Sequence, residues 1–101
     1  MTIPALLSRL KTCDPACYQE IMTYQQNGWT HPRNQALDYL QGVCQRACVT
    51  RRWDWQIRTF YADPLYYIAY VIGDGRDYEG QGDSPASAIL EAYVKACERQ
   101  T

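Results

Sequence analysis

Apolar residues in the first half of the chain recur every three or four positions, which is the period of an amphipathic helix. The pattern predicts three helices: residues 2–12, residues 15–26 behind the capping pair Asp14-Pro15, and residues 32–49 behind Thr30-His31-Pro32. The longest apolar stripe belongs to the third helix and consists of Ala36, Leu37, Leu40, Val43, Cys44, Ala47 and Cys48. The N-terminal half is therefore expected to be helical.

The period changes to two in the second half. In WDWQIRTF, residues 53–60, large apolar side chains alternate mostly with polar ones, which predicts a strand with one buried face. Beyond a turn at Asp63-Pro64, the run LYYIAYVI, residues 65–72, is apolar or aromatic on both faces, so it is expected to be a central strand covered on both sides. Gly73-Asp74-Gly75 predicts a hairpin turn, and the charged residues 77–81 suit a third strand at an exposed edge.

The segment GQGDSPASAILEAYVKAC, residues 80–97, contains a complete helix start. Gly80 and Gly82 let the chain turn back over the sheet. Ser84 is expected to be the N-cap, and Pro85 presets the first turn. One apolar stripe follows at helical spacing, formed by Ala86, Ile89, Leu90, Tyr93, Val94 and Cys97. A helix over residues 85–98 is therefore expected to pack on the sheet.

Together these elements predict an α+β fold with a helical N-terminal half, a three-stranded antiparallel meander over residues 53–81, and a C-terminal helix. If the last helix covers one face of the sheet and the earlier helices cover the other, the result is an α-β-α layered sandwich. No repeat or Pro/Gly/Ser-rich linker divides the chain, so residues 1–101 are expected to form a single domain.

Composition and charge restrict the classes of function. The longest uncharged apolar run, residues 64–73, is far shorter than the ~20 residues that span a bilayer, and the N-terminus lacks the pattern of a secretory signal. A cytoplasmic protein without a membrane span is expected. Residues 1–52 carry six Lys or Arg and three Asp or Glu, whereas residues 53–101 carry four and eight. This balance argues against broad attraction to nucleic acid.

The second half of the chain resembles a known family. The order of the strand WDWQI, the strand YYIAYV, a hairpin, and G-x-G-D-S-P-A-x-A-I-L at the start of the last helix is similar to the phage ABA-sandwich domain family, over residues 53–97. The resemblance implies an α-β-α sandwich from a phage or prophage and implies no catalytic residue. The five cysteines of this chain depart from the family pattern.

Three strands followed by G-x-G-x-S and an Ala-rich helix are also similar to the double-stranded-RNA-binding domain. That domain grips phosphate with lysines at the start of its last helix. Here SPASAILEA has no Lys or Arg before Lys95, and Glu79, Asp83 and Glu91 would repel phosphate. The charges therefore argue against binding of double-stranded RNA.

The leading functional prediction is a small phage-type binding protein without catalytic activity, which contacts a host or phage protein, for example to inhibit host defence. Its interface is predicted in the N-terminal half, at Trp29, His31, Tyr24 and Tyr39, because these side chains exceed what a short helical layer needs for packing. Trp29 at a loop tip is either an anchor for the partner or a hydrophobic staple beside the following helix.

The alternative prediction is a module that binds a nucleotide or single-stranded nucleic acid. It would use the local basic cluster Arg46, Arg51 and Arg52 together with aromatic side chains on the strands, on which bases stack. The plain interpretation of the same cluster is a solvated helix end.

The cysteines leave three alternatives open. Cys13 with Cys17 and Cys44 with Cys48 have the spacing of one helical turn, which is compatible with two disulfides or a four-thiolate zinc site, but free buried thiols are favoured. The single histidine, His31, lies at a helix start without an identified partner. No enzyme activity, metal or cofactor is therefore expected.

Overall fold

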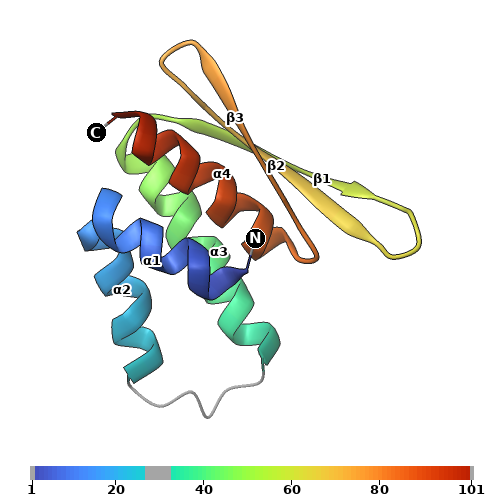
Figure 1. Cartoon of the computed structure of the whole chain (residues 1–101), viewed down its shortest axis with the longest axis horizontal. Helices are drawn as coiled ribbons and strands as arrows, with labels where there is room; N and C mark the ends of the chain where they lie inside the picture. Colours follow the sequence, from blue (N-terminus) through green and yellow to red (C-terminus); the bar gives the residue numbers. More distant parts are fainter. Residues whose placement is uncertain (1, 27–32, 101) are drawn as a thin grey trace.

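The computed structural model describes residues 2–26 and 33–100, and for residues 24–26 and 33–35 it describes the backbone only. The elements along the chain are α1 (Ile3–Cys13), α2 (Pro15–Gln26), α3 (Arg33–Thr50), β1 (Asp54–Phe60), β2 (Tyr66–Gly73), β3 (Arg76–Gly82) and α4 (Pro85–Gln100) (Figure 1). This order confirms the predicted α+β fold with a helical N-terminal half, a three-stranded meander and a C-terminal helix.

Side-chain caps are present at the start of three helices, and two of them are the caps that the sequence predicts, Asp14 and Ser84. The Thr2 hydroxyl accepts a hydrogen bond from the Ala5 amide at 3.3 Å at the start of α1. Asp14 Oδ1 accepts from the Cys17 amide at 3.1 Å at the start of α2. Ser84 Oγ accepts from the Ser87 amide at 3.1 Å, which confirms Ser84 as the N-cap of α4.

The three strands form an antiparallel sheet in the order β1-β2-β3, so β2 is the central strand as predicted. Asp74 and Gly75, both with positive φ, connect β2 to β3 as the glycine-containing turn indicates. α4 lies directly on β3 and β2, and Gly80 permits this close approach. A Cβ atom at position 80 would lie 2.1 Å from the backbone oxygen of Ala88.

α4 is the centre of the hydrophobic core. Ten of its residues are buried: Ala86, Ser87, Ala88, Ile89, Leu90, Ala92, Tyr93, Val94, Ala96 and Cys97. Ile89 and Leu90 are fully buried, as the predicted packing of this helix requires. α1 and α3 pack on α4, and α2 packs on α1 and α3.

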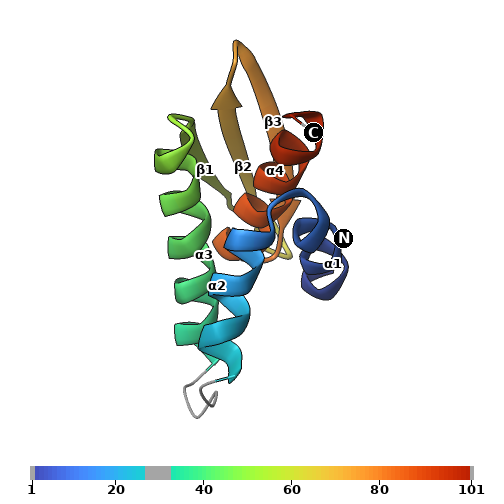
Figure 2. The ribbon, with the colours of Figure 1, turned by 90° about the vertical axis from the view of Figure 1, so that its left-hand side faces the viewer.

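The expectation that the earlier helices cover the second face of the sheet is wrong. Figure 1 and Figure 2 show the four helices on one side of the sheet, with α1 and α3 against α4. The physical reason is the small-residue composition of α4. Ala88, Ala92 and Ala96 are fully buried in addition to the larger apolar stripe, so most of the surface of α4 is apolar and needs cover from both the sheet and the other helices. Glu91, Lys95 and Glu98 form its polar side.

The burial of strand β1 also differs from the expectation. Trp53 precedes the strand and is 7% exposed, whereas Trp55 within it is 36% exposed. Ile57 is half-buried, and Thr59 is exposed. The expected buried face of this strand is therefore only partly covered, because α4 lies over β2 and β3 and makes little contact with β1.

Candidate binding surface

The face of the sheet turned away from the helices is called here the open sheet face. The strand registers place residues of three strands side by side on it, such as Gln56, Tyr70 and Glu79 in one row and Arg58, Ile68 and Gln81 in the next. The complete face consists of Asp54, Gln56, Arg58, Phe60, Tyr66, Ile68, Tyr70, Ile72, Asp77, Glu79 and Gln81. None of these residues is buried.

An apolar row follows the central strand along this face. Tyr66, Ile68 and Tyr70 are half-buried, and Ile72 is 37% exposed. The rings of Phe60 and Tyr66 are stacked, with centroids 5.0 Å apart and planes at 9°. The two stacked rings form the aromatic end of the row.

The charges of the open sheet face are divided between its two ends. Asp54 and Asp77 flank Ile72, and Glu79 lies beside Tyr70, so the end nearest the β2–β3 turn is acidic. Desolvation and a hydrogen bond to the Glu79 carboxylate raise the pKa of the Tyr70 phenol. At the other end, the Arg58 guanidinium lies 5.7 Å from the centroid of the Phe60 ring.

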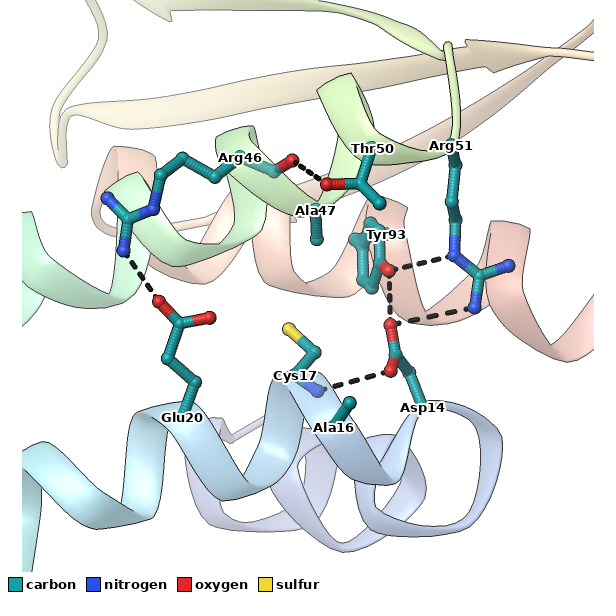
Figure 3. A pocket seen from close by; sticks show the side chains of 9 residues that line it. All are labelled: Asp14, Ala16, Cys17, Glu20, Arg46, Ala47, Thr50, Arg51 and Tyr93. Atoms are coloured by element: carbon teal, nitrogen blue, oxygen red, sulfur yellow. Dashed lines mark hydrogen bonds and ion pairs between the residues drawn. The ribbon is translucent and has the colours of Figure 1, made fainter.

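A polar network among the helices joins α2, α4 and the end of α3 (Figure 3). The Tyr93 hydroxyl donates to Asp14 Oδ2 at 2.5 Å, and Arg51 Nε donates to the Tyr93 oxygen at 3.0 Å. Arg51 Nη2 lies 3.5 Å from Asp14 Oδ2. Burial and the hydrogen bond to Asp14 raise the pKa of the Tyr93 phenol, so its hydroxyl keeps the donated proton.

This network borders a pocket of about 440 Å³ between α2 and α3, seen in Figure 3. Its walls are formed by Asp14, Ala16, Cys17, Glu20, Arg46, Ala47, Thr50, Arg51 and Tyr93. The charged groups of the pocket are paired with one another, since Arg46 Nη2 lies 2.8 Å from Glu20 Oε1 and Arg51 contacts Asp14. The geometry fits a structural tie between helices rather than a set of groups that awaits a ligand.

All five cysteines are buried and free. Burial raises the pKa of the Cys17, Cys48 and Cys97 thiols to about 12 and raises that of Cys44 well above its ordinary value. A protonated thiol is a weak nucleophile, and the buried cysteine side chains pack as small core residues. Among the described residues, no group of three or more His, Cys, Asp or Glu side chains is arranged to hold a metal ion.

The predicted protein-binding residues are only partly visible in the structure. Trp29 and His31 lie outside the described residues, and the side chain of Tyr24 is not described either. Tyr39 is half-buried and packs against the hydrophobic core. An interface at these four residues therefore stays a prediction. At least part of the Tyr39 side chain serves core packing.

The predicted nucleic-acid residues do not gather on the open sheet face. Arg46 and Arg51 are in the ion pairs described above, and the Arg51 guanidinium lies 4.9 Å from the centroid of the buried Trp53 ring. Arg52 is exposed at the junction of α3 and β1, with a φ of 60°. The structure thus separates this cluster from Tyr66 and Tyr70, the tyrosines of the open sheet face.

The open sheet face was missed because the pattern of residues 65–72 alone fits a strand covered on both sides. The sequence of the two flanking strands does indicate an exposed face. Residues 54, 56 and 58 and residues 77, 79 and 81 are polar or charged, and an antiparallel meander places both sets beside Ile68 and Tyr70. A face that is apolar in its central strand and polar in both flanking strands is typical of a partly exposed surface.

A scan against protein-family models and searches of curated proteins and of solved structures found no match to this chain. Among the described residues, no helix is long and apolar enough to span a membrane.

Proposed function

We propose that the chain is a protein-binding domain without catalytic activity, of the small phage or prophage type that its second half resembles, and that it binds its partner through the open sheet face. The single observation behind the proposal is the apolar row of Tyr66, Ile68, Tyr70 and Ile72, which none of the described helices covers. Tyrosines bring a large contact area with few rotatable bonds, which suits them to protein interfaces.

The charges of the face favour a protein over a nucleic acid as the partner. Arg58 is the only basic side chain among the residues of the open sheet face, which also include Asp54, Asp77 and Glu79. A phosphate backbone would meet net repulsion there. A host or phage protein that presents apolar side chains for the central row and basic side chains for the acidic end is the partner that fits.

The proposal of a non-catalytic role is supported by the chemistry of the remaining groups. The charged side chains of the pocket between α2 and α3 are paired, and burial raises the pKa of the Cys17 thiol that lines it to about 12. The pocket therefore presents no ready nucleophile or free general base.

The test compares two variants that add the same charge, one at a half-buried and one at an exposed apolar position. Ile68→Glu changes the centre of the open sheet face, and Val49→Glu, at a residue of α3 that is 62% exposed, is the matched control. The protein that co-purifies with the wild-type chain from the native host is produced in pure form, and its dissociation constant is measured by calorimetry. Ile68→Glu is expected to weaken binding by about 30-fold or more, and Val49→Glu by less than about threefold.

Equal binding by the Ile68→Glu variant and the wild type would remove the open sheet face from the interface. Binding of a single-stranded oligonucleotide that is lost in the Arg51→Ala/Arg52→Ala double variant would instead favour the alternative function. Circular dichroism of each variant establishes that the fold is retained.

A further inference from the structure

The two edges of the sheet differ in how far they are protected. At the β3 edge, the Lys95 ammonium of α4 donates to the backbone oxygen of Glu79 at 2.8 Å, and Asp77 and Glu79 add negative charge. Within residues 2–26 and 33–100, β1 has no such cover: all its residues are exposed except Ile57 and Phe60, which are half-buried. It also contains no proline. An edge strand of this kind presents unpaired backbone groups to another strand.

The sequence of β1 is complementary to itself when two copies run antiparallel. With Gln56 at the centre of symmetry, Asp54 of each copy lies opposite Arg58 of the other, and Trp55 lies opposite Ile57. Opposite charges and aromatic with β-branched side chains are the cross-strand pairs that stabilise antiparallel sheets. Each favourable pair occurs twice, because a two-fold axis repeats every contact.

From this complementarity we propose that β1 pairs with β1 of a second copy of the chain, antiparallel and centred at Gln56, so that two sheets join into one. Two other arrangements lose the charge pairs. A shift of the centre to Ile57 places Asp54 opposite Phe60, and parallel pairing in register places Asp54 beside Asp54 of the other copy. The charge pattern therefore selects a single register.

The proposed pairing also accounts for the exposure of Trp55. Trp55 and Ile57 lie on the helix side of the sheet, where Trp55 is left 36% exposed by its own chain. In the pair, Ile57 of the second copy lies beside this ring. The two-fold axis is perpendicular to the sheet, so the helices of both copies lie on one side and the two open sheet faces continue into each other on the other side.

The experiment measures self-association by sedimentation equilibrium, up to about 0.5 mM protein, for charge-reversed variants. Asp54→Arg and Arg58→Asp each place like charges opposite one another, and each is expected to weaken dimerisation by about tenfold. The double variant Asp54→Arg/Arg58→Asp restores opposite charges in the reversed sense, so its dissociation constant should return to within about threefold of the wild-type value. Asp77→Arg, the same charge change at the β3 edge, should leave dimerisation unchanged.

A wild-type chain that stays at the monomer mass of 11.7 kDa over this concentration range would overturn the proposal. A dimer that either single reversal leaves intact, or that the double variant fails to restore, would also overturn it. A dimer abolished by Ile68→Glu but unaffected by the charge reversals would place the second copy on the open sheet face instead. Partner binding by the open sheet face is measured by calorimetry in a separate experiment. The proposed dimer and the proposed partner-binding function can therefore be disproved independently of each other.

Discussion

The two faces of the sheet are built from the same strands but meet different surroundings. On the covered side, Ala69 and Val71 of β2 are fully buried beneath α4. On the open side, their neighbours Ile68 and Ile72 face away from the helices, with Ile72 37% exposed. Both faces of β2 are apolar, so apolar character alone does not decide burial. Burial depends on which face the helices pack against. α1 and α3 pack on α4, so the helices lie on the same side of the sheet.

The largest expected effect is the loss of stability at alkaline pH, because all five thiols belong to the covered side. The folded chain raises the pKa of Cys17, Cys48 and Cys97 from 9.0 to about 12. These groups contribute stability below pH 9 that is lost as pH rises toward 12, since the unfolded chain gives up its thiol protons first. The melting temperature, measured calorimetrically, should fall steeply from pH 9 to pH 11.

The variant Cys48→Ala provides the control for this pH dependence. It should be less stable than the wild type at pH 7 but should show a shallower fall above pH 9, because one shifted thiol is gone. A wild-type melting temperature that stays level between pH 8 and pH 11 would contradict the burial of these thiols.

Truncation of matched isoleucines compares the two faces directly. Ile89→Ala removes a fully buried side chain of α4 and is expected to cost about 2–5 kcal/mol of the free energy of unfolding. Ile72→Ala on the open sheet face should cost less than about 1 kcal/mol, because its side chain already meets solvent. Urea denaturation measures both values, and equal costs would mean that the two faces are equally covered.

Substitution of Gly80 by alanine tests how closely α4 approaches the covered face of the sheet. Gly80→Ala places a Cβ atom 2.1 Å from the Ala88 oxygen and 2.5 Å from the Ala92 nitrogen, so helix and strand must separate, at a cost of about 1–3 kcal/mol or more. Gly42→Ala in α3 meets only the flexible end of Arg46 at 3.4 Å and should stabilise the protein by up to about 1 kcal/mol. The opposite signs are the result to look for in denaturant titrations of the two variants.

The smallest effect concerns the start of α4. Ser84→Ala removes the side-chain acceptor for the Ser87 amide and should cost about 1 kcal/mol. Ser84→Asp keeps an acceptor at the N-cap and should retain most of the stability. A Ser84→Ala variant that melts at the wild-type temperature would show that the cap contributes nothing measurable.

The sequence predicts those parts of the fold that depend on neighbouring residues. The helix starts at Asp14-Pro15 and Ser84-Pro85, the turn at Gly73-Asp74-Gly75 and the central position of residues 65–72 all follow from local chemistry, and the structure confirms them. Caps and tight turns need only a few residues to specify their geometry.

The layer order could not be predicted in the same way, because it depends on how much of α4 has to be covered. The sequence pattern identifies the large residues of its stripe, such as Ile89 and Leu90, but Ala88, Ala92 and Ala96 are small and their burial depends on the partner they meet. The candidate binding surface could not be predicted from the sequence for a related reason. It combines residues of three strands, such as Arg58, Ile68 and Gln81, that become neighbours only once the strand register is known.

If one apolar face of the sheet is open, its isoleucines are accessible in solution, and this accessibility can be measured directly. Methyl groups are labelled with carbon-13, and their signals are recorded by NMR with and without a soluble paramagnetic agent. We expect strong broadening of the methyl signals of Ile68 and Ile72 and none of those of the fully buried Ile89. Protection of Ile68 and Ile72 equal to that of Ile89 would contradict this expectation, because the second face of the sheet would then be covered.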